Sequence, residues 1–464
     1  MHHTRTILSV ALLATLALGL APIQGCSGSD SVFGNGNGGN GAGGGDGGSY
    51  GILGGGGGSD GAQGPCVGLC TQQVSCPNGG STTLSGIAYA PTKVLPDPLY
   101  NAIVYVPNAP VAPFTVGVSC DKCGASVSGN PLVTALTGAD GKFTLTNVPV
   151  GDNIPLVLQL GRWRRQVVIP HVTACQDNIV DAGLSRLPRN KGEGDIPLTA
   201  ISTGKADALE CVLRKMGIDD SEFTLPSSDG RVRLYYENGA TMPGIPMAST
   251  LWSDPAELAK YDITILDCEG SQNDKPAQAQ QNVIDYTSAG GRVFASHYSY
   301  VWLYNDAPFS GTAGWNVEQS HPGGTLTGII DTSFPKGQSF LQWLGIVKAL
   351  SGPGTIAIQQ PRHDVDSVVP PSTRWIYSQA PDSLQHYTFN TPVGQDASNQ
   401  CGRVVFSDFH VTGNNGTSAD VAFPQECDNG PMLPQEKVLE FMMFDLASCI
   451  QNDNQPPTPP PPVK

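Results

Sequence analysis

The sequence predicts a multidomain protein of the β plus α/β class, in which a small antiparallel β-sandwich precedes a doubly wound, mostly parallel α/β domain. Residues 81–169 contain short strand-like runs separated by turn signals and show no helical periodicity, which is typical of a sandwich. Residues 196–450 instead alternate buried apolar runs with amphipathic helical stretches, the pattern of a parallel sheet covered by helices. A chain of 464 residues is long enough for more than one such domain.

Residues 1–26 have the pattern of an export signal. Arg5 precedes an almost wholly apolar run, and the run closes at Gln24-Gly25-Cys26. A small residue directly before a cysteine resembles the cleavage site of a bacterial lipoprotein. This resemblance implies an exported cell-envelope protein that a lipid on Cys26 anchors in the membrane, with the outer membrane as the expected one. A secreted protein without lipid and a permanent transmembrane helix are the alternatives.

Two segments are expected to remain outside any core. Glycine dominates residues 27–64, and a low-complexity segment of this composition acts as a flexible linker. Residues 451–464 are rich in proline and are expected to bury nothing. The formal net charge of −15 repels phosphate backbones. We therefore expect no nucleic-acid partner. A surface protein or a carbohydrate is the expected ligand.

Residues 65–189 comprise a cysteine-containing lead-in and the predicted sandwich. Strand-like runs lie at residues 81–89, 102–106, 156–160 and 166–169. Asp140-Gly141 forms a tight turn before an alternating strand, and the arginines around Trp163 are expected to form a solvated face. LSGIAYAP, NAIVYVP and GADGKFTLTNVPVG resemble the carboxypeptidase regulatory-like, transthyretin-like module. That resemblance implies a β-sandwich of exported and cell-surface proteins, with a structural or binding role and no catalytic residues.

Residues 190–450 carry the predicted α/β domain. Ser202 or Thr203 is expected to cap a helix that ends at Gly217. Further helices are predicted at residues 276–289, 340–350 and 434–449. Buried strands are predicted at residues 232–236, 262–266, 292–295, 355–358, 375–377, 387–389 and 403–406.

With Cys26 carrying the lipid, the other eleven of the twelve cysteines are expected to form disulfides, because an exported protein folds in an oxidising compartment. The six cysteines of the first half can pair among themselves: Cys66, Cys70, Cys76, Cys120, Cys123 and Cys175. Five remain in the second half, so one of them must stay free. Cys268 is the expected free cysteine because it ends a central strand. Cys120-x-x-Cys123 lies in a loop, which favours structural disulfides over a metal or redox motif.

Several polar residues follow predicted parallel strands and should meet at one edge of the sheet. YDITILDCEG, GGRVFASHYSY and GRVVFSDFHVTG, which contain Cys268, His297 and His410, resemble the class I glutamine amidotransferase-like fold, and most closely its trehalose-utilisation (ThuA-like) branch. The resemblance places His297 where catalytic relatives have the cysteine nucleophile, His410 at the base, and Thr412 where an acid is expected. Standard glutaminase activity is therefore not expected.

Three interpretations of this edge are open. In the first, which we favour from sequence, the protein is a cell-envelope lipoprotein with a binding or structural role and no retained catalysis. In the second, Cys268 is a nucleophile activated by His297 or His410, with Glu269 orienting the base, in a hydrolase. In the third, His297, Asp408 and His410 hold a divalent metal that activates water. No other cofactor is expected, and His363-Asp364-Val365-Asp366 is interpreted as a polar loop.

Overall fold

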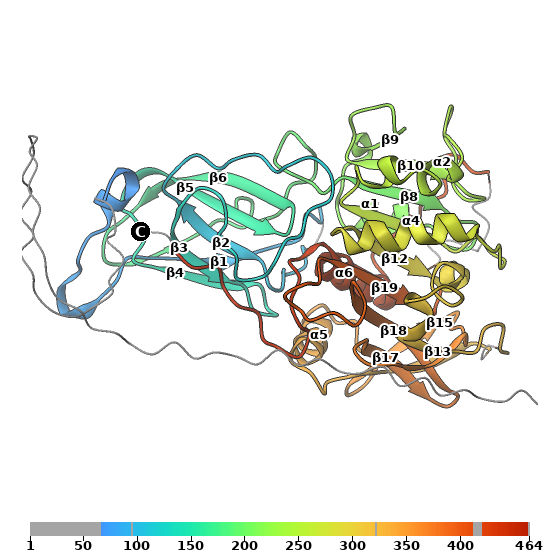
Figure 1. Cartoon of the computed structure of the whole chain (residues 1–464). Coiled ribbons are helices and arrows are strands. Elements are labelled where there is room, and N and C mark those ends of the chain that lie inside the picture. The colour runs from blue at the N-terminus through green and yellow to red at the C-terminus, as the bar shows by residue number, and fades with distance from the viewer. Residues whose placement is uncertain (1–65, 94–95, 321–322, 412–419, 463–464) are drawn as a thin grey trace, which may run out of the picture. The chain divides into compact units, whose positions relative to one another are not determined.

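The main sheet of the protein runs through its second half (Figure 1). The computed structural model describes residues 66–93, 96–320, 323–411 and 420–462. The export signal, Cys26 and the glycine-rich linker lie outside these residues. In the described chain, ten strands form one sheet in the order β15-β14-β17-β18-β19-β12-β11-β8-β10-β9.

One side of this sheet, which we call the parallel half, holds six parallel strands in the described chain, and the other side holds four antiparallel strands. The parallel strands are β8 (Thr199–Thr203), β9 (Phe223–Thr224), β10 (Val232–Tyr236), β11 (Ile263–Leu266), β12 (Arg292–Ser296) and β19 (Gly402–Ser407). The antiparallel strands are β14 (Thr325–Ile330), β15 (Thr355–Gln359), β17 (Thr373–Gln379) and β18 (Asp382–Thr391). A separate pair joins β13 (Ala313–Trp315) to β16 (Val365–Val368).

Helices cover both faces of the parallel half, which explains why its strands are apolar on both sides. Side chains alternate across a strand, so Ile265 of β11 and Phe294 of β12 share a core with α1 (Leu209–Lys215), α5 (Pro335–Ile346) and α6 (Pro434–Ala447). Their neighbours Leu266 and Ala295 face α2 (Ser249–Trp252), α3 (Pro255–Leu258) and α4 (Ala277–Ser288). No helix in the described chain is both long and apolar enough to cross a bilayer.

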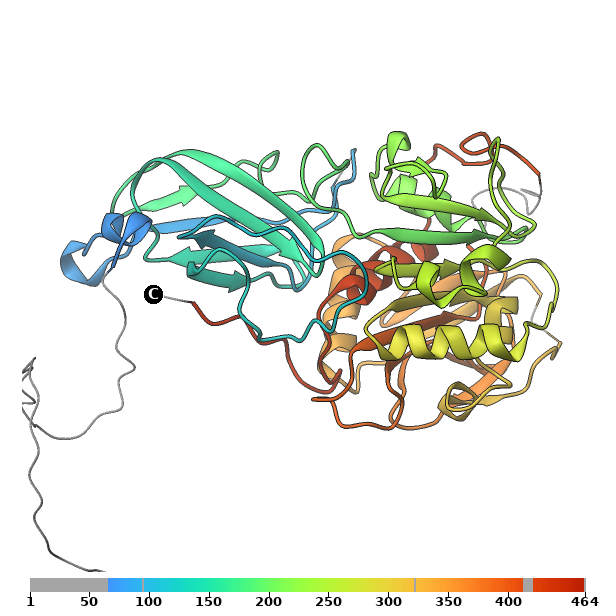
Figure 2. The same cartoon turned by 45° about the horizontal axis from the view of Figure 1, so that its top comes forward.

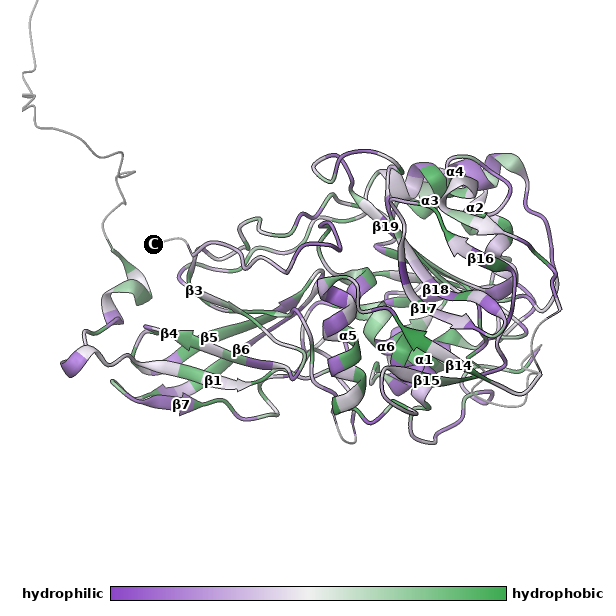
Figure 3. Cartoon of the chain, turned by 90° about the horizontal axis from the view of Figure 1, so that it is seen from below, coloured by the Kyte–Doolittle hydropathy of each residue, from purple (hydrophilic) through white to green (hydrophobic). Residues whose placement is uncertain are grey.

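The first half holds two small sheets whose side chains share one apolar core, and we refer to this pair of sheets as the sandwich. In the described chain one has the order β4-β1-β7 and the other the order β3-β2-β5-β6. The strands are β1 (Thr83–Ile87), β2 (Ile103–Pro107), β3 (Pro131–Leu136), β4 (Lys142–Thr146), β5 (Gly151–Leu160), β6 (Trp163–Val172) and β7 (Asp177–Ile179). The pairing is not wholly antiparallel, because β7, a hydrophilic edge strand (Figure 3), runs parallel to β1.

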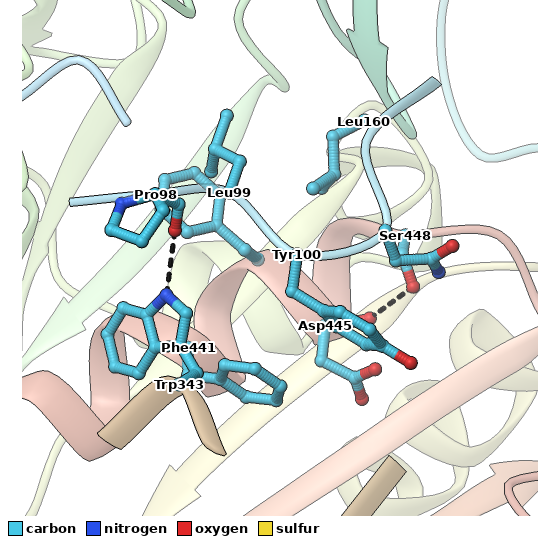
Figure 4. Close-up of a pocket in the computed structure, with 10 residues that line it drawn as sticks. Pro98, Leu99, Tyr100, Leu160, Trp343, Phe441, Asp445 and Ser448 are labelled. Atoms are coloured by element: carbon cyan, nitrogen blue, oxygen red, sulfur yellow. Dashed lines mark hydrogen bonds between the residues drawn. The ribbon is translucent and has the colours of Figure 1, made fainter. Parts of the chain in front are cut away.

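The sandwich packs on α5 and α6 through a shared apolar core, and the chain from Gly61 onward forms one compact unit. At this contact the Trp343 indole N–H donates to the carbonyl of Pro98 at 2.7 Å, and Tyr100 stacks on Phe441 (Figure 4). The arginine cluster around Trp163 lies on the same side of the sandwich as this contact. Trp163 and Arg164 are buried, and Arg164 pairs with Asp195, so the predicted solvated face is wrong.

Two of the five disulfides in the described chain link the two halves, which the sequence interpretation did not predict. In the described chain the pairs are Cys66–Cys70, Cys76–Cys175, Cys120–Cys401, Cys123–Cys449 and Cys211–Cys427. Pairing within the first half is therefore wrong for Cys120 and Cys123, because their loop reaches the α/β domain. Cys268 is the free cysteine of the described residues, as predicted.

Two further expectations are wrong. Ser202 and Thr203 are not helix caps, because they end the buried central strand β8. The proline-rich tail does bury residues: Asp453 is 5% exposed, Pro460 is buried, and the Thr134 hydroxyl donates to the Pro460 carbonyl at 2.8 Å. Figure 2 shows this segment running back beside the sandwich.

Candidate functional site

Four neighbouring parallel strands deliver polar residues to one edge of the main sheet. β19, β12, β11 and β8 are adjacent in the sheet, and their carboxyl ends lead to His410, His297, Cys268 and Asp207. This is the edge at which open α/β sheets bind ligands. Gly204 permits the loop after β8 to pack closely here, since a Cβ on this residue would lie 2.3 Å from the Cys268 carbonyl oxygen.

His297 occupies a sharp turn between β12 and the 3-10 helix η4 (His297–Trp302). Its φ is +37°, in a region that residues with a Cβ rarely adopt. Such local strain persists where the surrounding structure enforces it, and it is common at functional sites. The resemblance placed the amidotransferase nucleophile at this turn, and in this chain an imidazole stands there.

Cys268, His297 and His410 converge on one another and are all buried. The Cys268 Sγ lies 3.3 Å from the His297 Nδ1 and 3.3 Å from the His410 Nε2. The two imidazole nitrogens are 2.7 Å apart, which is hydrogen-bond distance. The thiol is therefore in contact with two bases that come from two other strands.

Each imidazole is also contacted by a residue from one loop. The His297 Nε2 lies 3.4 Å from the Asp364 Oδ2, and the Arg362 Nη2 lies 3.0 Å from the His410 Nδ1. The loop is held beside the end of β19, because the Arg362 and Asp364 backbone N–H groups both donate to Asp408, to its carbonyl and its Oδ2 respectively, at 2.8 Å each. Asp364 also accepts from the Glu318 backbone N–H at 2.7 Å.

The thiol is protonated in the resting site. Burial, followed by the charge of Asp207, raises the pKa of Cys268 well above its ordinary value. The Gly270 and Tyr298 backbone N–H groups and the Arg362 guanidinium act in the opposite direction but do not offset the burial. Nucleophilic use of this sulfur would therefore require a base in contact with it.

Three carboxyl groups, Asp207, Glu210 and Asp267, which we call the carboxyl cluster, lie beside Cys268, and Arg362, which acts on Asp207, does not balance their charge. Burial raises the pKa of Asp207 to about 7 and that of Glu210 to about 8, and it raises the pKa of Asp267 well above its ordinary value. Asp207 accepts the Val411 backbone N–H at 2.8 Å, and the Glu210 and Asp267 side chains interact with each other. Strongly perturbed groups of this kind concentrate at functional sites.

Two residues predicted for the site have other partners. Glu269 pairs with Lys275 and accepts from the Asn273 amide at 2.8 Å. Lys275 also pairs with Glu237, so Glu269 belongs to this ion cluster. Asp408, a predicted metal ligand, is absent from the Cys268–His297–His410 group, and burial raises its pKa, followed by the charge of Asp364.

Arg362 and Asp364 are the residues that sequence interpretation missed. Asp364 belongs to a segment predicted to be a polar loop, and that prediction is wrong in part, because Val365 and Asp366 begin strand β16. His363 pairs with Asp366 at 3.0 Å. Arg362 carried no sequence signal. Its contact with His410, 48 residues away, depends on the bridge between Pro361 and Phe409.

A metal ion is not favoured by the donor geometry. The ligand atoms of Cys268, His297 and His410 lie within 4.8 Å of one another, and thiolate with two imidazoles suits zinc. An imidazole that binds metal through Nε2 carries its proton on Nδ1, however, and the His410 Nδ1 faces Arg362, which can only donate. The two requirements conflict, so the residues present do not fit a metal at His410.

Comparisons with known proteins give no family and only distant structural likenesses. No family model and no curated protein matches this sequence. A putative ThuA-like protein from Bacteroides uniformis is 11% identical and covers 55% of this chain and 93% of its own, with a TM-score of 0.30. The mmIFT52 N-terminal domain is 10% identical and covers 53% of this chain and 97% of its own, with a TM-score of 0.30. A putative ThuA-like protein from Parabacteroides merdae is 13% identical and covers 48% of this chain and 84% of its own, with a TM-score of 0.26. Scores of this size assign neither family nor activity.

Proposed function

We propose that the α/β domain is a thiol-dependent hydrolase of acyl compounds, with Cys268 as nucleophile and His297 as general base. The observation that carries the proposal is the contact of the Cys268 Sγ with the His297 Nδ1 at 3.3 Å, while the other nitrogen of that ring faces Asp364 at 3.4 Å. A nucleophile, a base in contact with it and an acid that orients the base form the arrangement used for covalent catalysis.

The proposed reaction begins with a protonated thiol. The Cys268 sulfur attacks the carbonyl carbon of an ester, thioester or amide, and the thiol proton passes to the His297 Nδ1. His297 then gives this proton to the leaving alcohol, thiol or amine, and a thioester on Cys268 remains. Water hydrolyses the thioester with His297 again accepting the proton. The Asp364 carboxylate stabilises the imidazolium that forms in each half of the reaction.

The proposed chemistry differs from that of a glutaminase because the nucleophile follows a different strand of the sheet. Cys268 follows β11, whereas the turn after β12 carries His297. Membership of the ThuA-like branch is part of the proposal and is supported by the motifs around Cys268, His297 and His410. We therefore expect a substrate other than glutamine, because the base, His297, occupies the position that corresponds to the nucleophile of an amidotransferase.

We place this activity at the bacterial cell envelope. The support is the lipoprotein-like end of residues 1–26 at Cys26, which implies a lipid anchor. The five disulfides of the described chain add to it, since disulfides persist in oxidising compartments. Globomycin, which blocks lipoprotein signal cleavage, should leave the signal on the chain, and cleavage that is indifferent to it would contradict the lipid anchor.

Acetyl transfer from p-nitrophenyl acetate tests the hydrolase. The folded full chain should release nitrophenolate, and peptide mass spectrometry should find an acetyl group on Cys268. Cys268→Ala should abolish both signals and His297→Gln should slow them. His171→Gln is the matched control, because His171 is an exposed histidine of the sandwich that contacts Asp152 at 2.6 Å. Acetylation at other sites alone, or release unchanged in Cys268→Ala, would contradict the proposal.

A binding or structural role is the second candidate, and the burial of the thiol favours it. Cys268 is 0% exposed, so a substrate must displace other groups to reach the sulfur. In this alternative the sandwich contacts a surface protein or carbohydrate, and the buried polar edge only shapes the domain. The chain would then bind purified peptidoglycan or a polysaccharide array equally well with Cys268 and His410 both replaced by alanine, and p-nitrophenyl acetate would not label Cys268.

A further inference from the structure

We propose that Arg362 is a positioning residue that holds the proton of His410 on Nε2, so that the two imidazoles contact Cys268 in opposite roles. His297 accepts the thiol proton, and His410 donates a hydrogen bond to the sulfur once that proton has left. The inference rests on the proposed thiol chemistry and adds a role for Arg362, which acts through His410.

The tautomer of His410 follows from its contact with Arg362. A guanidinium has N–H donors and no acceptor, so the His410 Nδ1, 3.0 Å from the Arg362 Nη2, must present its lone pair. A neutral imidazole has one N–H, which then lies on Nε2. Arg362 is itself held in place, because its Nη1 donates to the Pro361 carbonyl at 3.0 Å.

The tautomer of His297 follows from His410. The His410 Nε2–H lies 2.7 Å from the His297 Nδ1, which must therefore accept, so the proton of this ring is also on Nε2, on the side where the Asp364 Oδ2 lies at 3.4 Å. The His297 Nδ1 therefore presents a lone pair, and it lies 3.3 Å from the Cys268 Sγ. Both rings carry their proton on Nε2, yet they meet the sulfur through different nitrogens.

These two tautomers give a directed proton path at the sulfur. At rest the His410 Nε2–H is nearer to the His297 Nδ1, at 2.7 Å, than to the Sγ, at 3.3 Å. When the thiol proton moves to the His297 Nδ1, that nitrogen can no longer accept. The His410 N–H then turns to the thiolate, which takes a charge-assisted hydrogen bond in its place. One imidazole removes the proton and the other stabilises the charge left behind.

Nuclear magnetic resonance of the full chain labelled with ¹⁵N-histidine tests this assignment. The wild-type spectrum should show His297 and His410 as Nε2–H tautomers. Arg362→Met should move the His410 proton toward Nδ1, and Arg362→Lys, which retains a donor, should restore Nε2–H. Arg374→Met is the matched control, since Arg374 is a more exposed arginine that pairs with Asp331 at 2.7 Å. A wild-type His410 with its proton on Nδ1 overturns the inference.

The reactivity of Cys268 supplies a second readout. Alkylation by iodoacetamide, located by peptide mapping, should be slower by about tenfold in Arg362→Met, because the thiolate loses a charge-assisted hydrogen bond. Recovery of the rate in Arg362→Lys supports the inference, whereas an unchanged rate in Arg362→Met overturns it. The hydrolase proposal is decided separately: with the expected tautomers but no acetylation of Cys268, the hydrolase fails and the role of Arg362 in thiol ionisation stands.

Discussion

Two groups of buried charged residues in the α/β domain differ in how their charges are balanced. Lys336, Arg403, Asp445 and Asp453, which we call the ionic square, are at most 7% exposed and pair around a closed ring at 2.8–3.0 Å. The carboxyl cluster is as deeply buried, but it holds three acids and no paired cation. The square is neutral when ionised, whereas the cluster can be neutral only when it is protonated.

The pKa values follow this difference. Burial disfavours the charged forms in the square, but the partners more than offset it: Arg403 and Lys336 lower the pKa of Asp453, and the acids raise the pKa of both cations. In the carboxyl cluster the hydrogen bonds to these groups and the charge of Arg362 on Asp207 do not outweigh the burial, and the pKa values rise. A balanced buried network indicates a structural role, and a buried surplus of one charge beside a thiol indicates a functional site.

Breaking the square should have the largest effect on stability. Arg403→Met leaves two buried carboxylates with only Lys336, and we expect a loss of about 3–5 kcal/mol in the free energy of unfolding. Urea titration of the full chain measures it. Arg374→Met, which removes a single ion pair with a half-exposed arginine, should cost less, about 1 kcal/mol. Equal costs for the two variants would show that the square is not a structural unit.

The pH dependence of stability should separate the two groups. The folded-state pKa values of Asp207, about 7, and Glu210, about 8, lie above the ordinary carboxyl values of 3.8 and 4.5. The folded state therefore binds more protons than the unfolded state in this window, and the free energy of unfolding falls as pH rises from about 4 to about 8. Each group contributes a slope of up to about 1.4 kcal/mol per pH unit.

The square should respond in the opposite direction and at lower pH. Its stabilisation is present above the ordinary carboxyl pKa of about 4 and is lost as pH falls further, because Asp453 has a lowered pKa. Glu210→Gln should flatten the neutral part of the stability curve and leave the acid limb unchanged. A free energy of unfolding that rises between pH 5 and pH 8 in urea titrations would contradict the raised carboxyl pKa values.

Removal of the Cys123–Cys449 disulfide should cost less than breaking the square. This bond fixes the segment that carries Asp453, and it closes a sequence separation of 326 residues. Cys120–Cys401 already joins the same regions, however, so the loop that this bond closes is effectively about 50 residues, and we expect a loss of about 3 kcal/mol for the double serine variant. Calorimetry measures it, with the serine variant of Cys66–Cys70 as control, since that pair spans only 4 residues.

Replacement of Cys268 should have the smallest effect on stability. Cys268→Ala removes one buried sulfur and leaves the carboxyl cluster in place, so we expect a change of about 1 kcal/mol in urea titrations. The same variant should lose all acetyl transfer. A destabilisation as large as that of Arg403→Met would instead assign the thiol to the structural framework.

The sequence was most informative where local pattern and structure agree. The apolar runs of β11, β12 and β19 and the polar residues after them were predicted, and with them the convergence of Cys268, His297 and His410. Parallel order alone places these ends together. β8 was missed because its residues Thr199–Thr203 include polar side chains that also favour helix caps, and only its neighbours in the sheet decide between the two.

The partners of the site could not be predicted from periodicity. Arg362 and Asp364 reach the imidazoles through a loop whose position depends on hydrogen bonds to Asp408. The choice of Cys401 and Cys449 as partners of Cys120 and Cys123 depends equally on how the halves pack. The loop contacts and the disulfides alike join residues that are far apart in the sequence, so neither the number of cysteines nor the strand pattern predicts them.

The two disulfides between the halves set an order on the maturation of the chain. Cys120 and Cys123 precede Cys401 and Cys449 by 281 and 326 residues, so their native partners become available only when nearly the whole chain has been made. During that interval they can oxidise with each other or with the cysteines near the sandwich. A disulfide isomerase that reverses such early pairings should therefore raise the yield of native protein more than an oxidase alone.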